Sequence, residues 1–241
     1  MSSAHTAGTA NGAPAGPDTA PDALLNVLIA DDEELTRTGL RALLSAKPDL
    51  EVVGEAADGA EVLPLVVRLR PDVVLMDVRM PRLDGIEATR RLRSELSDPP
   101  KIIVITTFEN DEYVYDALQA GASGFVLKRA PARQIAQAIR LVATSDSVLF
   151  PEAVRRLATS RPVRRESARK VDALTHRETD ILRRMAKGLT NQEISTELIV
   201  SVETVKTHVG NVLAKLGAQN RTQAVILAYE TGLVGLGASG P

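Results

Sequence analysis

Five polar residues that suit phosphate chemistry each end or follow a short apolar run of the chain. They are Asp31, Asp32, Asp77, Thr106 and Lys128. Carboxylates that lie close together repel one another unless a cation lies among them, and a few oxygen ligands of this kind suit Mg²⁺. A metal ion and an ammonium group around one nucleophilic carboxylate would favour phosphoryl transfer, because this reaction depends mainly on positioning and charge neutralisation. A single aspartate here would predict only a helix cap or a turn, so the prediction depends on the five residues lying together.

The segments between these residues predict that they do lie together. Five apolar, strand-like runs alternate with segments whose apolar residues have helical spacing, which is a βα repeat. The strand-like runs are 26–30, 51–56, 72–76, 101–106 and 124–127. Short connections and right-handed crossovers fold such a repeat into a doubly wound parallel sheet with helices on both faces. The carboxyl ends of parallel strands share one edge, so we expect the five polar residues to converge there.

The composition excludes several classes of protein. The 241 residues include no cysteine, which rules out a disulfide, a zinc–thiolate site and a cysteine nucleophile. The first residues lack the basic and apolar regions of a signal peptide, and no apolar run is long enough to span a membrane. We therefore expect a cytoplasmic protein that makes no membrane contact. The net charge of −2 conceals a basic segment, because residues 142–171 hold seven Lys or Arg against three Asp or Glu. We interpret this segment as a solvated linker in preference to a nucleic-acid contact.

The N-terminal repeat also carries motifs that are highly specific in combination. They are Ala30-Asp31-Asp32-Glu33, Met76-Asp77-Val78-Arg79-Met80-Pro81, Asp84-Gly85, Thr106-Thr107 and Ser123-Gly124-Phe125-Val126-Leu127-Lys128. With these motifs, residues 25–143 resemble the receiver domain of a two-component response regulator, which is a flavodoxin-like five-stranded α/β fold.

This resemblance implies a role for each position. Asp77 would accept a phosphoryl group from a sensor histidine kinase. The ligands of Mg²⁺ would be Asp32, Asp77, the backbone carbonyl of Arg79 and, through a water molecule, Asp31. Thr106 and Lys128 would contact the phosphoryl oxygens, and Thr106 and Phe125 would form the switch. The chain has Phe125 where many relatives carry Tyr, and Arg129 where receivers often carry Pro.

The C-terminal part of the chain predicts a small all-α domain. Two Thr-x-x-Glu tetrads, at 175–178 and 190–193, have the spacing of a capping box and mark two helix starts. Ser201 is placed to cap a third helix, predicted at 202–216. A helix at 191–198, a three-residue turn and this third helix make a helix-turn-helix, whose second helix enters the major groove of DNA.

Residues 172–236 resemble the LuxR-type helix-turn-helix domain of response regulators of the NarL/FixJ group. The matching motifs are Leu174-Thr175-x-Arg177-Glu178, Gly188-Leu189-Thr190-Asn191-x-Glu193-Ile194, Ser201-x-x-Thr204-Val205-Lys206-x-His208-Val209, Lys215-Leu216-Gly217 and Arg221-x-x-Ala224-Val225. The resemblance implies that Lys206, Thr207 and Gly210 face base edges. It also implies that Thr190, Asn191 and Thr204 lie near phosphates. Gly210 departs from relatives that carry Lys at this position, and Ile199 departs from the commoner Gly.

Together these features predict a DNA-binding transcriptional response regulator that is switched by phosphorylation of Asp77. We expect a disordered tail at 1–24, a linker at 144–171 and a second tail at 237–241. The expected partners are a sensor histidine kinase, a double-stranded DNA operator with an inverted repeat, a second copy of the chain on activation, and RNA polymerase. The resemblance implies no enzyme activity beyond the receiver's own phosphorylation and dephosphorylation.

Two alternative functions remain open at this point. One is a DNA-binding regulator with an atypical receiver that works without phosphorylation. The other is a Mg²⁺-dependent phosphatase that forms an aspartyl-phosphate. Such phosphatases usually carry a second Asp two residues after the nucleophile, where this chain has Arg79, so this alternative is disfavoured.

Overall fold

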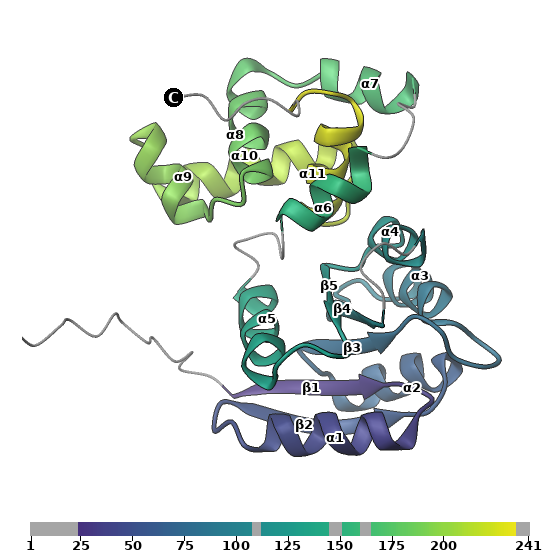
Figure 1. Cartoon of the computed structure of the whole chain (residues 1–241). Helices are drawn as coiled ribbons and strands as arrows, with labels where there is room; N and C mark the ends of the chain where they lie inside the picture. Colours follow the sequence, from purple (N-terminus) through teal and green to yellow (C-terminus); the bar gives the residue numbers. More distant parts are fainter. Residues whose placement is uncertain (1–23, 108–111, 145–150, 160–164, 235–241) are drawn as a thin grey trace, which may run out of the picture.

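A computed structural model describes residues 24–107, 112–144, 151–159 and 165–234 of the chain. Of the tail predicted at 1–24 only Leu24 is described, and the tail predicted at 237–241 lies outside the described residues. Within the described ranges, no helix is both long enough and apolar enough to cross a membrane. The chain forms an α/β unit, in the lower part of Figure 1, and a helical unit, in its upper part.

Five parallel strands form the centre of the α/β unit, in the order β2-β1-β3-β4-β5. They are β1 (Leu25–Ala30), β2 (Leu50–Ala56), β3 (Val73–Asp77), β4 (Lys101–Thr106) and β5 (Gly124–Leu127). The bounds of each strand lie within one residue of the predicted run. The strand order reverses between β1 and β3, which places the ligand-binding crevice of this fold at their carboxyl ends.

Helices cover both faces of the sheet, because its strands are apolar on both sides. The covering helices are α1 (Glu34–Ser45) and α5 (Ala132–Thr144) on one face, and α2 (Gly59–Leu69), α3 (Gly85–Glu95) and α4 (Glu112–Gln119) on the other. Neighbouring strand residues alternate between the two layers: Ile29 packs with α1 and α5, and Leu28 packs on the opposite face. The predicted doubly wound sheet is therefore confirmed.

In the described residues, six helices make up the helical unit. They are α6 (Pro151–Thr159), α7 (Arg165–Asp172), α8 (His176–Ala186), α9 (Asn191–Leu198), α10 (Val202–Leu216) and α11 (Arg221–Glu230). Both Thr-x-x-Glu tetrads form the capping boxes that their spacing predicts, at the starts of α8 and α9. Helices α6 and α7 lie largely within the segment interpreted as a linker. Helix α6 packs against α11, and its Val154 and Ala158 are fully buried. This part of the chain therefore does more than connect two domains.

Helices α9 and α10 have the predicted helix-turn-helix arrangement. The side chain of Ser201 caps α10 by accepting a hydrogen bond from the N–H of Thr204 at 3.1 Å. Helix α9 ends at Ile199, which has a φ of 54° and is 91% exposed. A left-handed backbone is strained for a β-branched residue, so the departure from Gly at this turn carries a conformational cost.

Candidate functional site

The three predicted acidic residues meet at the carboxyl edge of the sheet. Asp77 is the last residue of β3, and Asp31 directly follows the neighbouring strand β1. One carboxylate oxygen from each of Asp31, Asp32 and Asp77 lies within 4.8 Å of the others. Asp31 is 0% and Asp77 is 7% exposed, whereas Asp32 is open to solvent. This acidic cluster (Asp31, Asp32 and Asp77) therefore lies where a doubly wound sheet binds its ligands.

Lys128, which follows β5, brings a positive charge to the acidic cluster. Its Nζ lies 2.8 Å from Oδ2 of Asp31 and 3.2 Å from Oδ2 of Asp77. A third carboxylate, that of the exposed Glu33, lies 3.6 Å from the same nitrogen. Burial acts to lower the pKa of Lys128, but its hydrogen bonds to Asp31 and Asp77 and their charges outweigh burial, and the pKa is raised. Lys128 therefore remains a cation at neutral pH.

The pKa of Asp77 is raised to about 6. Burial is the largest cause; the charge of Lys128 opposes it, and the charge of Asp31 adds to it. Three carboxylates against one nearby ammonium group leave the acidic cluster with an excess of negative charge, and two of the three are withdrawn from water. A divalent cation with oxygen ligands would neutralise this charge, so the residues present fit the expected Mg²⁺.

Gly85 allows helix α3 to begin against the backbone of Asp77. A Cβ atom at position 85 would lie 1.9 Å from the carbonyl oxygen of Asp77, so a larger residue would displace the end of β3. The N–H of Gly85 donates to the carbonyl of Val78 at 3.0 Å, which holds the turn closed. Gly85 belongs to the Asp84-Gly85 motif, but the motif alone did not predict a role for it. Glu33 was also not predicted, because an exposed Glu after two aspartates gives no sign of a distant lysine.

The two predicted switch residues lie on the neighbouring strands β4 and β5. Thr106 ends β4, and Phe125 lies inside β5; both side chains are buried. The N–H of Lys128 donates to the carbonyl of Thr106 at 2.7 Å, which joins the end of β4 to the segment that carries the ammonium group. The guanidinium of Arg79 lies 5.3 Å from the centre of the Tyr113 ring, a cation–π contact between the β3–α3 loop and α4.

The residues predicted to contact DNA lie on α9, on α10 and at their N-termini. Lys206, Thr207 and Gly210 are exposed on α10, as is Thr204 near its start, and Thr190 caps α9. The Nζ of Lys206 lies 2.9 Å from Oε1 of Glu203 on the same helix. An exposed ion pair of this kind contributes little to stability, so Lys206 can exchange it for an external anion at little cost.

Asn191 differs from the other predicted DNA contacts because it is buried. Its Oδ1 accepts a hydrogen bond from Nη1 of Arg221 at 2.9 Å. Arg221 also donates to the carbonyl of Leu189, so Asn191 and Arg221 together fix the start of α9 to α11.

Two families match the chain. Residues 27–140 match the response regulator receiver domain, and residues 172–228 match the luxR family of bacterial regulatory proteins. The transcriptional regulatory protein LiaR of Bacillus subtilis (strain 168) is 45% identical over 211 residues, which cover 88% of this chain and 100% of LiaR. This chain is a LuxR-type response regulator. The response regulator protein VraR of Staphylococcus aureus (strain NCTC 8325 / PS 47) is 41% identical over 210 residues, which cover 87% of this chain and 99% of VraR.

Solved structures agree with this assignment. A two-component response regulator of the LuxR family from Aurantimonas sp. SI85-9A1 matches with a TM-score of 0.52 at 31% identity, over 57% of this chain and 98% of that chain. The RcsB response regulator of Salmonella typhimurium matches with a TM-score of 0.50 at 26% identity, over 84% of this chain and 97% of that chain. The α/β unit is therefore a receiver domain and the helical unit contains a LuxR-type DNA-binding domain. The chain is a DNA-binding transcriptional regulator of a two-component system.

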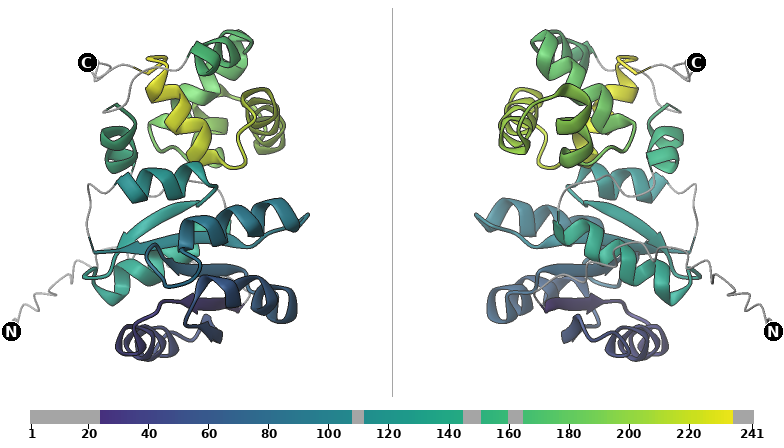
Figure 2. Two further views of the ribbon diagram at one scale, coloured as in Figure 1. Left: turned by 90° about the vertical axis from the view of Figure 1, so that its right-hand side faces the viewer. Right: turned by 90° about the vertical axis from the view of Figure 1, so that its left-hand side faces the viewer.

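In this response regulator, helix α11 of the DNA-binding domain contacts helix α4 of the receiver, and the views in Figures 1 and 2 agree on this placement. Three side chains at or just before the start of α11 donate hydrogen bonds to the receiver. Their acceptors are backbone carbonyl groups between the end of α4 and the start of β5. The pairs are Asn220 to the carbonyl of Gly121 at 2.8 Å, Thr222 to that of Ser123 at 2.6 Å, and Gln223 to that of Gln119 at 2.7 Å. At the other end of α11, the buried hydroxyl of Tyr115 donates to the carboxylate of Glu230. The two domains are thus held by polar contacts at both ends of α11.

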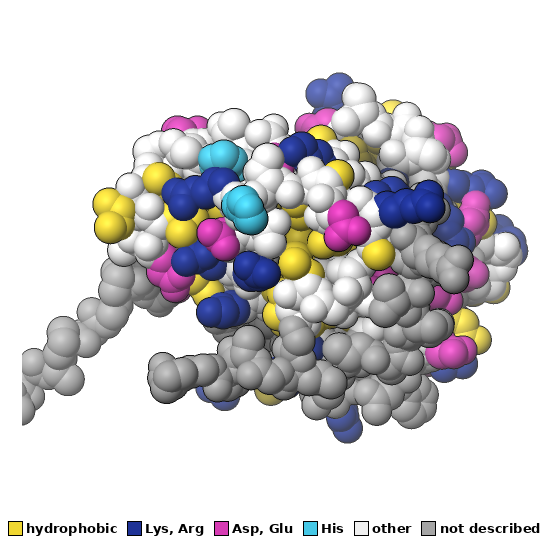
Figure 3. All heavy atoms as spheres, turned by 90° about the horizontal axis from the view of Figure 1, so that it is seen from above, with side chains coloured by type: hydrophobic (Ala, Val, Ile, Leu, Met, Phe, Trp, Pro, Cys, Tyr) yellow, Lys and Arg dark blue, Asp and Glu magenta, His cyan; other side chains and the backbone are white. Residues whose placement is uncertain are grey.

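Part of the predicted DNA-contact face of α10 is turned toward the receiver in this arrangement. Lys206 and Gly210 line a cavity of about 310 Å³ whose other side includes Lys101, Ser123 and Val142 of the receiver. We call this space the interdomain cavity. It has the size of a small molecule and is too small to admit a DNA duplex. On the face of the DNA-binding domain that is turned away from the receiver, acidic side chains are interspersed among basic ones (Figure 3).

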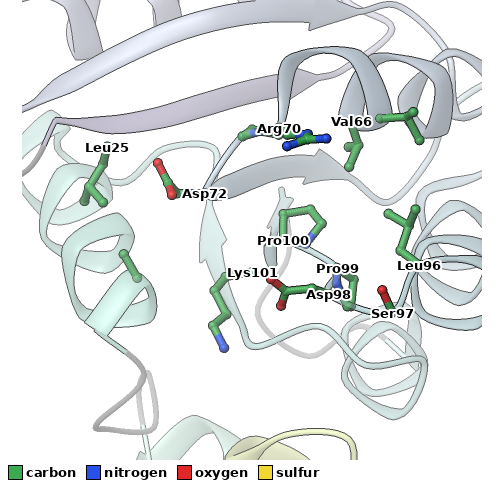
Figure 4. Close-up of a pocket in the computed structure, with 13 residues that line it drawn as sticks. Leu25, Val66, Arg70, Asp72, Leu96, Ser97, Asp98, Pro99, Pro100 and Lys101 are labelled. Carbon is green, nitrogen blue, oxygen red and sulfur yellow. The ribbon is translucent and has the colours of Figure 1, made fainter.

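A larger cavity, of about 640 Å³, lies at the opposite edge of the sheet from Asp77 (Figure 4). Its lining includes Leu25, Asp72 and Lys101, which lie at or next to the amino ends of β1, β3 and β4. Parallel sheets of this kind bind their ligands at the carboxyl edge, so the size of this cavity does not make it the site of phosphoryl chemistry.

Proposed function

We propose that a sensor histidine kinase phosphorylates Asp77 of this regulator, and that phosphorylation releases α10 from the receiver so that it can bind an operator. The observation that supports the chemistry is the convergence of Asp31, Asp32, Asp77 and Lys128 at one edge of the sheet. The observation that supports the release is that Lys206 and Gly210 face the receiver.

The acidic cluster would take up the phosphoryl group as follows. A carboxylate oxygen of Asp77 attacks the phosphorus of a phosphohistidine, so that a P–O bond forms as the P–N bond breaks. Mg²⁺, held by Asp32, Asp77, the backbone carbonyl of Arg79 and, through water, Asp31, would neutralise the charge of the incoming group. With a pKa of about 6, Asp77 is ionised and nucleophilic at neutral pH.

Lys128 and Thr106 would hold the product. The ammonium of Lys128 already lies 3.2 Å from the carboxylate of Asp77, so it can contact a phosphoryl oxygen placed on that carboxylate. Thr106 ends the strand next to β3, and its hydroxyl would donate to another phosphoryl oxygen. Movement of Thr106 toward this oxygen would change the packing space available to Phe125 on the neighbouring strand.

Strand β4 connects the two edges of the sheet. It begins at Lys101, beside the interdomain cavity, and ends at Thr106, beside the acidic cluster. At about 3.3 Å per residue, its six residues span roughly 17 Å. Helix α4 carries Tyr115 and Gln119, both of which hold α11. A shift of β4 and α4 on phosphorylation would therefore weaken the hydrogen bonds between α4 and α11. The population would move from this closed arrangement of the two domains toward an open one, in which they are apart.

Release would expose the DNA-binding face. Lys206, Thr207 and Gly210 would then meet base edges in the major groove, and Thr190, Asn191 and Thr204 would lie near phosphates. A homodimer would match an inverted repeat whose half-sites are separated by helical turns of DNA. RNA polymerase is the further partner that a bound transcriptional regulator would influence.

The test compares the full-length protein with Asp77→Ala, and uses Asp98→Ala as a control because Asp98 is an exposed aspartate at the other edge of the sheet. An operator is first selected from random-sequence DNA. Adding Mg²⁺ with beryllofluoride should then increase operator affinity and the mass of the complex for the wild type and for Asp98→Ala. Asp77→Ala should not respond. The same operator affinity and mass with and without beryllofluoride in the wild type would remove the switch from this proposal.

A further inference from the structure

The interdomain cavity is lined by positive charge and by polar donors. Lys101 contributes from the receiver, and Lys206 and Arg221 contribute from the DNA-binding domain. No Asp or Glu is among the described residues that line it. Lys206 and Arg221 have partners in Glu203 and Asn191, so their contribution is the positive potential that they add to the space. A small cavity with this lining favours an anion.

Lys101 is the cation best placed to bind such an anion. It is half-buried at the start of β4, and among the described residues no carboxylate lies within 4.0 Å of its ammonium group. Lys101 lines both cavities, and the interdomain cavity is the one that it shares with Lys206 and Arg221. Burial lowers the pKa of Lys101 and the charge of Arg93 lowers it further, while the charge of Asp98 opposes them only in part. A negative ligand beside Lys101 would relieve both effects.

Ser123 supplies a hydroxyl group that lacks a partner in the described part of the chain. Its Oγ is buried and makes no hydrogen bond to any described residue, although its carbonyl accepts from Thr222. A buried hydroxyl group is normally hydrogen-bonded, because leaving it unpaired loses the bonds that it made in water. Ser123 and Lys101 line the same cavity, so a single ligand there would lie next to both residues.

We propose that the interdomain cavity binds a phosphate oxyanion, carried by orthophosphate or by a small phosphate monoester. Lysine and hydroxyl groups are common donors to phosphate, and a doubly charged anion suits a space lined by several cations better than a singly charged one does. The site is separate from Asp77, and the proposal therefore goes beyond phosphorylation of the receiver. The bound anion contacts both domains. Its concentration would therefore regulate the protein in addition to phosphorylation.

This ligand acts on the balance between the closed and open arrangements. Because its site needs both walls of the cavity, it binds only when the domains are together. By mass action, a ligand at about 100 times its dissociation constant raises the ratio of closed to open protein about 100-fold. A high concentration of the anion would therefore oppose release of α10 and raise the degree of phosphorylation needed for DNA binding.

The binding test uses the full-length protein at constant ionic strength without Mg²⁺ or a phosphoryl donor, so its result does not depend on whether Asp77 can be phosphorylated. Orthophosphate and adenosine monophosphate are titrated separately by calorimetry. We expect one site per chain, with affinity at least tenfold weaker in Lys101→Gln and in Ser123→Ala. Lys47→Gln, which changes a receiver lysine outside the cavity, should bind as the wild type does. Tighter binding of the monophosphate would identify a monoester as the ligand, and tighter binding of orthophosphate would identify the free anion.

Three results of this binding test would overturn the proposal. The first is the absence of saturable binding of either probe. The second is unchanged affinity in Lys101→Gln, provided that its denaturation midpoint matches the wild type. The third is loss of binding in Asp77→Ala, because it would place the anion at the acidic cluster.

Operator binding distinguishes this site from simple competition with DNA. At constant ionic strength, orthophosphate should weaken operator binding by the wild type but not by Lys101→Gln, since Lys101 lies on the receiver. Equal weakening of both proteins would mean that phosphate competes with DNA at α10, and would also overturn the proposal.

Discussion

Replacing Asp77 by Asn should stabilise this protein at neutral pH. The pKa of Asp77 is raised from 3.8 to about 6, chiefly because the carboxyl group is buried. A carboxyl group with a raised pKa keeps its proton longer in the folded than in the unfolded protein. The folded state therefore loses stability as the pH rises from 3.8 to about 6, and the full cost is present above that pH. An amide at this position cannot ionise and avoids the cost.

The size of the effect follows from the change in pKa. A rise from 3.8 to about 6 corresponds to an upper limit of about 3 kcal/mol. The part of Asp77 that still meets water reduces this value, so we expect the free energy of unfolding of Asp77→Asn to exceed that of the wild type by about 2 kcal/mol at pH 8. The gain should fall to about 1 kcal/mol at pH 5. This pH is about midway between the pKa of Asp77 in the unfolded protein, 3.8, and that in the folded protein, about 6, so only about half of the cost is present.

The assay is urea denaturation of the full chain at pH 5, 6 and 8, followed by circular dichroism. Asp98→Asn controls for the loss of one negative charge at an exposed position. Mg²⁺ should stabilise the wild type more than Asp77→Asn, because only the wild type keeps all three carboxylates of the acidic cluster. A gain that is absent at pH 8, or equal at every pH, would refute the argument that burial of an ionised Asp77 costs stability.

Three further predictions concern the contact between the domains, the packing of Gly85 against Asp77, and the predicted DNA-binding face of α10. Tyr115→Phe removes the hydroxyl that donates to Glu230, and should raise the operator affinity of the unphosphorylated protein by about 10- to 150-fold, because a buried hydrogen bond to a charged group contributes about 1.5–3 kcal/mol. Fluorescence anisotropy with labelled operator measures this change, and an unchanged affinity would show that the contact does not hold the domains together. Gly85→Ala should destabilise the receiver by about 1–3 kcal/mol and slow phosphorylation by acetyl phosphate, because the added Cβ must displace the carbonyl of Asp77; a normal melting temperature with a normal rate would contradict this account. Lys206→Ala should weaken operator binding by about 1–3 kcal/mol while phosphorylation stays normal, and undiminished DNA affinity would mean that the recognition face is misplaced.

Much of the fold could be predicted because its signals are local. Strands such as 101–106 are apolar on both sides, and a run of this kind between helical segments predicts a buried parallel strand. The capping boxes at Thr175 and Thr190 use only residues three apart, so their spacing alone predicted where α8 and α9 begin. The edge of the sheet to which Asp77 belongs also follows from the sequence, because every parallel strand ends at the same edge.

The chemical state of the site could not be predicted in this way, because it depends on distances in space. The pKa of Asp77 reflects its burial and the positions of Lys128 and Asp31, which are 51 and 46 residues away in the sequence. The need for Gly85 becomes apparent only when the start of α3 is seen against the carbonyl of Asp77. No pattern in the sequence around either residue reports that approach.

By itself, the sequence determined the two domains' folds, the edge that carries the acidic cluster and the helix that can enter the major groove. Only the tertiary structure decided that this helix faces the receiver, that Lys101 and Ser123 share a cavity with Lys206, and that α6 packs on α11. The reason is that helices, caps and strands are set by neighbours a few residues apart. The contact between the domains joins residues about 100 positions apart, such as Gln119 and Gln223, and their pairing depends on how two finished surfaces fit together.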